Sequence, residues 1–239
     1  MIQIEGKTVA ELVTEDYRTA DVFKKNGIDF CCGGKVSVKE ICLKKKVSYD
    51  EIVKQIENIT KEHNAAVNYN DWSVDFLADY IVEKHHGYVK NNIPLIMQYA
   101  EKVARVHGES SPETIEVRTL FEVIAQELSA HMQKEELILF PHIKKLGKAQ
   151  KGEITYSAPP FGTIKNPIDM MELEHEQVGD FGEKIRLITN NYSPPEYACN
   201  TFRVLYAKLK EFEDDLHEHI HLENNILFPK ALALEEAFR

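Results

Sequence analysis

An eleven-residue pattern that occurs twice constrains the fold of this chain more than any other feature. Residues 131–141 read HMQKEELILFP and residues 219–229 read HIHLENNILFP, with six identical positions. In each copy a histidine and a glutamate are four residues apart, which puts both on one face of a helix. The chain therefore has two related halves, and neither half could bury its apolar face alone.

Each half contains a second histidine upstream of the repeat. His86 and His175 are 89 residues apart, which nearly equals the 88 residues between His131 and His219. Apolar residues at steps of three and four surround all four histidines, so the pattern predicts four amphipathic helices packed as a four-helix bundle. The predicted stripes are Val82, His86, Val89, Ile93 and Ile96; Phe121, Ile124, Leu128, His131, Glu135 and Ile138; Met171, His175, Val178, Gly182 and Ile185; and Phe212, Leu216, His219, Glu223 and Ile226 or Leu227.

The remaining pattern predicts an all-α protein with two domains. No stretch shows sustained alternation of β-branched residues between turn signals. We expect a small helical N-terminal domain at residues 1–59, a polar linker at 60–73 and the bundle at 74–239. Glycine- and proline-containing loops are expected at residues 107–114, 190–196 and, as the longest, 147–167.

Composition narrows the range of functions. With 29 basic and 39 acidic side chains the formal net charge is −10, and the whole excess lies in residues 61–239, which hold 19 basic and 29 acidic side chains. A basic face that could follow nucleic-acid phosphates is not expected. No signal peptide or long uncharged apolar run occurs, and four cysteines are too few for a disulfide framework. These features predict a soluble, cytoplasmic protein that binds neither nucleic acid nor membrane.

The polar residues inside the apolar stripes indicate a metal site. Burying imidazoles and carboxylates among Leu, Ile and Phe is costly unless something compensates. Four imidazoles and two carboxylates suit iron or manganese better than structural zinc, and two ions bridged by Glu135 and Glu223 would use all six donors. Taken singly, each histidine could be a hydrogen-bonded core residue, and each His-x-x-x-Glu pair an exposed ion pair. The repetition of the whole arrangement favours metal.

Other histidines and one further glutamate have different expected roles. His217 and His221 are expected on a solvated face, because acidic and amide residues share it. Glu174, beside His175, is a candidate outer partner of a ligand or a third bridging carboxylate. Structural or exposed positions are expected for His63, His85, His107 and His142.

The N-terminal region contains the sequence DFCCGGK at residues 29–35. Adjacent cysteines do not easily form a disulfide with each other, and the pair lacks the C-x-x-C spacing of zinc or thioredoxin sites. Two following glycines indicate a tight turn with accessible thiols, and Lys35 could lower a thiol pKa. From the pattern alone, Cys31 and Cys32 are either a buried structural pair or a reactive pair. Cys42 and Cys199 are expected in the core.

Together these segments resemble a known family. DFCCGGK, ELSAHMQKEELILFPHI, PIDMMELEHEQVG and DDLHEHIHLENNILFP, in this order, are similar to the RIC family of di-iron proteins for the repair of iron centres. The resemblance implies a hemerythrin-like four-helix bundle after an ScdA-type N-terminal domain. It implies two non-haem iron ions with bridging glutamates and an oxo or hydroxo bridge, and it favours reactive thiols at Cys31 and Cys32. The implied iron ligands are His86, His131, Glu135, His175, His219 and Glu223, with His85 as the alternative to His86.

The resemblance also implies a function, the restoration of iron–sulfur clusters damaged by nitric oxide or hydrogen peroxide in the cytoplasm. We expect an iron donor, with damaged iron–sulfur proteins as clients and nitric oxide or oxygen as small ligands. The alternatives are a di-iron nitric oxide or peroxide reductase and a module that binds or senses a gas. Pairing of two chains into a homodimer is compatible with these patterns.

Overall fold

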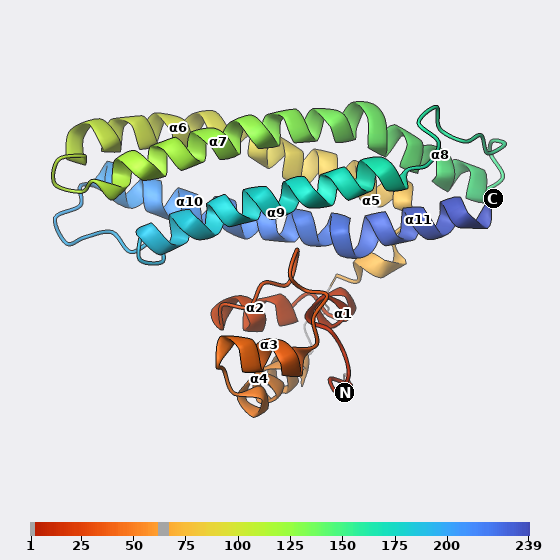
Figure 1. The fold of residues 1–239 in the computed structure, drawn as a ribbon, viewed down its shortest axis with the longest axis horizontal. Coiled ribbons are helices and arrows are strands. Elements are labelled where there is room, and N and C mark those ends of the chain that lie inside the picture. The colour runs from red at the N-terminus through yellow and green to blue at the C-terminus, as the bar shows by residue number, and fades with distance from the viewer. Residues whose placement is uncertain (1–2, 62–66) are drawn as a thin grey trace. The chain divides into compact units, whose positions relative to one another are not determined.

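The computed structural model describes residues 3–61 and 67–239. Within these ranges the protein consists of helices and connecting loops without a β-strand, which confirms the all-α class (Figure 1). Residues 62–66, which include His63 and part of the expected linker, lie outside the described residues. The chain divides into two compact units: Ala78–Leu216 is one, and Met1–Leu77 together with His217–Arg239 is the other.

Four long helices form the unit Ala78–Leu216. They are α6 (Gly87–His107), α7 (Glu113–Lys134), α9 (Lys165–Ile188) and the first part of α10 (Asn200–Leu222). Helix α7 packs against α6 and α9, and its Phe121 ring meets the Phe212 ring of α10 edge-on, with the ring centroids 5.2 Å apart. The predicted stripes supply the core: Val89, Ile96, Phe121, Ile124, Leu128, Met171, Val178, Ile185, Phe212 and Leu216 are buried. The helical bundle expected from the sequence is thereby confirmed.

Each copy of the repeat contains a wide, π-helical turn that begins at its glutamate. The turns are η3 (Glu135–Leu139) and η4 (Glu223–Leu227), and Phe-Pro follows each as the start of α8 (Phe140–Gln150) and α11 (Phe228–Ala237). A proline has no N–H, and its ring clashes with the carbonyl four residues earlier. Widening the turn accommodates the proline and shifts the helix face by one residue. As a result Ile138, expected inside, is 47% exposed, and Leu139 is buried instead.

A third wide turn, η2 (Ile81–His86), lies between α5 (Val74–Tyr80) and α6. It buries both histidines of the His85-His86 doublet, although on a regular helix two adjacent residues point about 100° apart.

The longest loop is shorter than expected. Helix α8 continues through the buried Gly147 to Gln150, and α9 begins at Lys165, so the loop covers residues 151–164. Pro167 lies in the first turn of α9, where its missing N–H breaks no helical hydrogen bond. Within the loop, the Phe161 ring meets the His142 ring of α8 edge-on, with the centroids 4.8 Å apart.

The other unit begins with four short helices, α1 (Val9–Glu15), α2 (Thr19–Lys25), α3 (Val38–Lys45) and α4 (Tyr49–Lys61), followed by the single turn η1 (Tyr69–Asp71). Thr8 and Glu11 form a capping box at the start of α1, and Ser37 caps α3. The core contains Leu12, Phe23, Ile28, Ile52 and Ile56, all fully or almost fully buried.

The face around His217 and His221 is not solvated, so that expectation was wrong. The Phe30 ring lies 5.8 Å from the rings of both histidines, and the Tyr17 ring lies 5.8 Å from that of His221. His221 is fully buried, and burial lowers its pKa to about 4. The repeat comparison was misleading because the counterparts of these histidines, Ser129 and Gln133, are exposed; the second copy packs against the N-terminal helices.

Two cysteine expectations had different outcomes. Cys42 is buried, as predicted, but Cys199 is exposed, so its assignment to the core was wrong. It follows the Pro-Pro turn and directly precedes α10, with its Sγ 3.3 Å from Nε2 of His107. His107 is itself the last residue of α6 rather than a loop residue.

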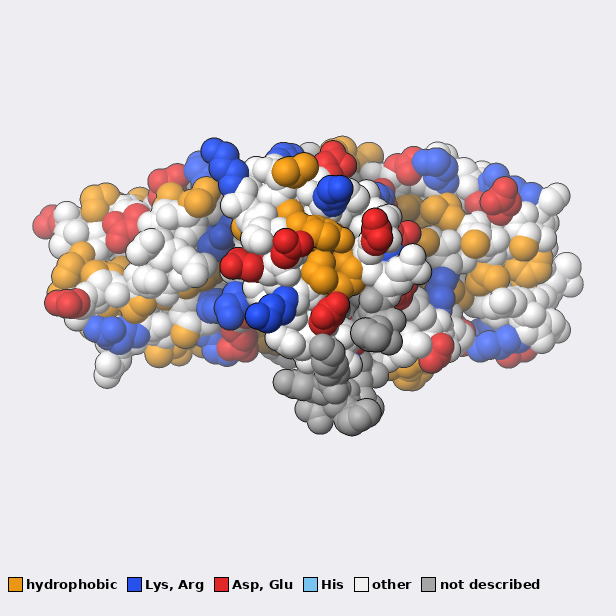
Figure 2. Space-filling view, turned by 90° about the horizontal axis from the view of Figure 1, so that it is seen from below, with side chains coloured by type: hydrophobic (Ala, Val, Ile, Leu, Met, Phe, Trp, Pro, Cys, Tyr) orange, Lys and Arg blue, Asp and Glu red, His pale blue; other side chains and the backbone are white. Residues whose placement is uncertain are grey.

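The face drawn in Figure 2 carries charged side chains of both signs. Acidic and basic side chains are interspersed on it, and a few apolar side chains adjoin one another near its centre. Across residues 3–61 and 67–239, none of the helices has both the length and the apolar character required to span a bilayer.

Candidate metal centre

Three histidines of the unit Ala78–Leu216 converge on one carboxylate. Nε2 of His86 in η2 and Nε2 of His131 in α7 each lie 3.3 Å from Oε2 of Glu135. Nε2 of His175 in α9 lies 2.9 Å from Nε2 of His131. None of these four side chains is more than 2% exposed. Donor atoms of His131, Glu135 and His175 all lie within 4.8 Å of one another. Three separate helical segments thus bring imidazole nitrogens close to the carboxylate at the start of the wide turn η3.

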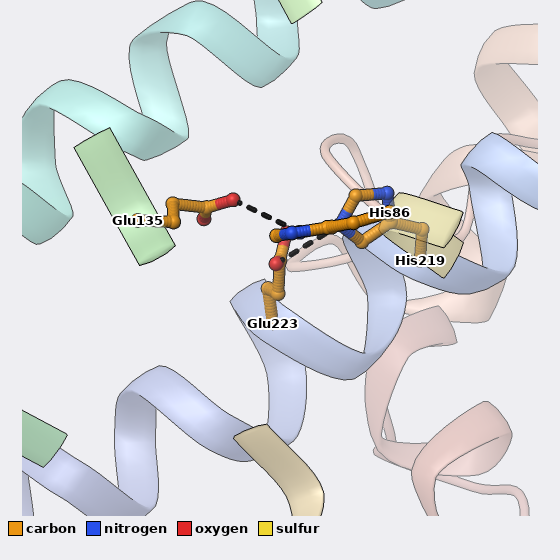
Figure 3. Close-up of side chains that lie close together, drawn as sticks. All are labelled: His86, Glu135, His219 and Glu223. Atoms are coloured by element: carbon orange, nitrogen blue, oxygen red, sulfur yellow. Dashed lines mark hydrogen bonds and ion pairs between the residues drawn. The ribbon is translucent and has the colours of Figure 1, made fainter. Parts of the chain in front are cut away.

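The second copy of the repeat forms a similar pair in the other unit. His219, near the end of α10, has its Nε2 3.0 Å from Oε1 of Glu223, the first residue of η4. Both side chains are buried. Figure 3 draws the His86–Glu135 and His219–Glu223 pairs, with a dashed line along each contact.

Two further carboxylates, those of Glu136 and Glu174, contact histidine rings at Nδ1, the nitrogen that does not face Glu135, and are called the outer carboxylates here. Nδ1 of His86 lies 2.7 Å from Oε1 of Glu136, and Nδ1 of His131 lies 2.8 Å from Oε2 of Glu174. When Nδ1 carries the proton and donates it to the carboxylate, Nε2 keeps its lone pair for a metal. Each carboxylate also accepts a hydrogen bond from a lysine one turn from the histidine it holds: Lys90 for Glu136 and Lys134 for Glu174.

These contacts keep both outer carboxylates ionised. The hydrogen bond from His131, together with that from Lys134, outweighs burial and lowers the pKa of Glu174 to about 2. For Glu136, burial acts to raise the pKa, but the hydrogen bonds from Lys90 and His86 outweigh it and the pKa is lowered. Glu174 was identified from the sequence by its position beside His175. Glu136 was missed, although its place beside Glu135 was an equivalent signal.

The two residues of the His85-His86 doublet have separate partners. Nδ1 of His85 lies 3.0 Å from Oδ1 of Asp215 in α10, and its ring meets that of Tyr80 edge-on. His86 is the one whose Nε2 faces Glu135.

The paired cysteines lie on a tight turn between α2 and α3. Cys31 is buried and Cys32 is half-buried, with their Sγ atoms 4.0 Å apart and no disulfide between them. The Asp29 carboxylate accepts hydrogen bonds from the backbone N–H groups of Cys31 and Gly33. Access to this thiol pair is therefore through Cys32.

Buried imidazoles and carboxylates with anchored outer nitrogens are a donor set for a metal of intermediate hardness. Nitrogen and oxygen donors without sulfur suit iron or manganese, and the fixed rings require little rearrangement on binding. The chemistry of the side chains present therefore fits an iron site.

Comparison with known proteins agrees with this chemistry. Residues 77–231 match the family model described as the hemerythrin HHE cation binding domain, so the larger part of the chain is a hemerythrin-like domain. Residues 5–60 match the ScdA N-terminal domain, described as a domain of unknown function, DUF542.

Curated relatives match most of the chain. The iron-sulfur cluster repair protein YtfE of Yersinia pestis (strain Pestoides F) is 36% identical over 216 residues, which cover 90% of this chain and 91% of the relative. The protein of the same name from Yersinia pseudotuberculosis serotype IB (strain PB1/+) is 37% identical over 212 residues, which cover 88% and 90%. The chain belongs to this RIC family of iron–sulfur cluster repair proteins, as its sequence motifs predicted.

Proposed function

We propose that this protein binds two non-haem iron ions in one centre and donates iron to damaged iron–sulfur clusters. Glu135 and Glu223 would bridge the ions, and an oxo or hydroxo group would complete the bridge. The six proposed ligands are His86, His131, Glu135, His175, His219 and Glu223. The observation that carries the proposal is the position of the buried Glu135, which lies 3.3 Å from two imidazole nitrogens while a third imidazole nitrogen lies 2.9 Å from one of these.

The register of α10 supports one common centre. This helix is continuous from Asn200 to Leu222, and Asp215 on it contacts His85 of the bundle. His219 and Glu223 follow Asp215 at four-residue steps, so helical periodicity keeps them on the same face. The hemerythrin family match extends over residues 77–231 and so includes all six ligands. The separate partner of His85 supports His86 as the ligand of the doublet.

Bound iron would supply redox chemistry and a transferable ion. The chain would hold that ion by nitrogen and oxygen donors alone, which bind ferrous iron less tightly than a cluster's sulfur ligands do. Cys31 and Cys32 would act as transfer or redox thiols. Damaged iron–sulfur proteins would be the clients, and nitric oxide or oxygen would be small ligands at open iron positions.

Two further features belong to this proposal. We assign the protein to the reducing cytoplasm, which is supported by four free cysteines. We also divide the sequence into an ScdA-type domain at 1–59, a linker at 60–73 and a hemerythrin-like domain at 74–239, which is supported by the family matches at 5–60 and 77–231.

Iron donation is tested with a cluster enzyme that nitric oxide has inactivated. The iron-loaded protein is expected to restore more activity than the same amount of free ferrous iron, and a C31S/C32S variant that still holds its iron is expected to restore less. Recovery no better than with free iron would overturn the donor function. Sustained production of nitrous oxide without loss of iron would identify a reductase instead.

The outer carboxylates provide a prediction about iron affinity. E174Q and E136Q are each expected to weaken iron binding about 10–100-fold, because the histidine loses the anionic acceptor that fixes its ring. Iron retention is measured by competition with a chelator. E127Q is the matched control, since Glu127 is exposed on α7. Retention equal to that of the control would show that Glu136 and Glu174 do not support the centre.

A further inference from the structure

The turn that carries the paired cysteines also brings a carboxylate to them. Oδ1 of Asp29 lies 3.1 Å from Sγ of Cys31, and the two sulfur atoms are 4.0 Å apart. One oxygen and two sulfur atoms, one from each residue, all lie within 4.8 Å of one another. Two sulfur atoms bound to one tetrahedral ion at about 2.3 Å would lie about 3.8 Å apart, only slightly closer than these two.

The backbone holds these donors in place. Oδ1 of Asp29 accepts a hydrogen bond from the Cys31 N–H at 2.8 Å, and Oδ2 accepts one from the Gly33 N–H at 2.7 Å. Both oxygens are thereby fixed toward the turn, and the carboxylate cannot swing away from the thiols without losing both bonds. The donor geometry is preorganised rather than formed by a mobile loop.

The two glycines are required by this folding of the turn. A Cβ atom on Gly34 would lie 2.4 Å from the carbonyl oxygen of Phe30 and 3.0 Å from Cβ of Ala10. A Cβ atom on Gly33 would lie 2.9 Å from Oδ2 of Asp29. On the other side, the Asn225 amide donates to the Cys31 carbonyl at 3.2 Å. The sequence D-F-C-C-G-G is thus a compact structure that presents two thiols and a carboxylate together.

We propose that Asp29, Cys31 and Cys32 form a second, separate cation site that takes a divalent, thiolate-binding metal ion such as ferrous iron. Two thiolates and one carboxylate supply three donors, and the half-buried position of Cys32 leaves the remaining coordination positions open to water or to a ligand from another protein. An open position is the property of a site that receives and releases an ion, whereas structural sites are closed by four protein ligands.

Binding exchanges protons for metal and involves no electron transfer. A divalent ion forms two metal–sulfur bonds as the two S–H bonds break, and two protons leave to solvent. Metal affinity therefore increases with pH while these thiols compete with protons for the ion.

The site has a natural place in the proposed function. If the bundle donates iron, a thiolate site with open coordination positions can bind the ion as an intermediate site, from which it is transferred to a sulfur-rich client. That role rests on the proposed function, but binding of a cation to the turn does not.

The test is a titration of the reduced, iron-loaded protein with Cd²⁺, followed by the ultraviolet charge-transfer absorption of cadmium thiolates. The nitrogen and oxygen donors of the bundle give no such band, so the signal reports on the turn. We expect stoichiometric binding in the wild type, loss of the band in C32S and in C31S, and about tenfold weaker binding in D29N. C199S is the matched control, because Cys199 is exposed beside His107, and it should leave the band unchanged.

Absence of the band from folded wild-type protein, or its loss in C199S rather than in C32S, would overturn the site. Circular dichroism of each variant confirms that it is folded. A band that depends on Cys32 in a protein that repairs no cluster would uphold the site and reject the donor function. Cluster repair by a protein that shows no band would uphold the donor function and reject the site.

Discussion

Replacement of Glu135 by alanine is expected to abolish iron binding by the bundle. Oε2 of Glu135 lies 3.3 Å from nitrogens of two proposed histidine ligands. As a bridge the carboxylate would bind both ions, so its loss removes a bond to each. The fold should survive, because deleting a buried carboxylate relieves a desolvation cost that the metal-free protein otherwise bears. Iron per chain and circular dichroism, measured on the same preparations, separate the two effects.

The control for this variant is E127A, on the exposed side of α7, the helix that directly precedes Glu135. It should keep full iron content and the wild-type spectrum. If E135A also keeps its iron, Glu135 is not a bridging ligand and the two-ion centre is wrong. If E135A binds no iron because it is unfolded, E135Q, which preserves the size of the side chain, decides the question.

The variant G34A is expected to destabilise the unit formed by Met1–Leu77 and His217–Arg239 by about 2–4 kcal/mol. The added methyl group would overlap the Phe30 carbonyl, which is backbone and cannot rotate away, so the turn must shift. Trp72 is the single tryptophan of the chain, and it packs edge-on against Tyr69 and Phe76 within the same unit. Its fluorescence during urea unfolding therefore reports on this unit.

The comparison variant is G179A, within helix α9. Nothing lies within 4 Å of a Cβ atom at this position, and alanine is favoured over glycine in a helix by about 1 kcal/mol, so a small stabilisation is expected. Because α9 belongs to the unit Ala78–Leu216, circular dichroism is used to follow its unfolding. A G34A protein that unfolds at the wild-type urea concentration would show that the turn tolerates a side chain and that the close approach to Phe30 is not required.

Periodicity was sufficient to predict the long helices and the burial of His86, His131, His175 and His219. Apolar steps of three and four lead directly to the faces that α6, α7, α9 and α10 bury, and the repeat identified Glu135 and Glu223 as buried polar groups. Regular periodicity could not predict the wide turns, because one extra residue per turn changes which of Ile138 and Leu139 faces inward. It also gave no reason to bury both His85 and His86.

Contacts between segments that are distant in the sequence could not be predicted from it. The burial of His221 depends on Tyr17 and Phe30, about two hundred residues earlier in the chain. An amphipathic pattern shows only that a helix face is polar. A polar face that packs against aromatic rings of another segment has the same sequence pattern as one that is exposed to water. Glu136 lies beside Glu135, but its contacts with His86 and Lys90, which are on other helical segments, were not predicted.

The pairing of Met1–Leu77 with His217–Arg239 has a consequence for biosynthesis. A ribosome releases the N-terminal helices first, but the segment that covers Phe30 and donates the Asn225 hydrogen bond to Cys31 is translated about two hundred residues later. The cysteine turn therefore acquires this support only after residues 217–225 have been synthesised. The same late segment carries His219 and Glu223, so a nascent chain reaches the supported thiol pair and the full set of proposed iron ligands at the same stage of synthesis.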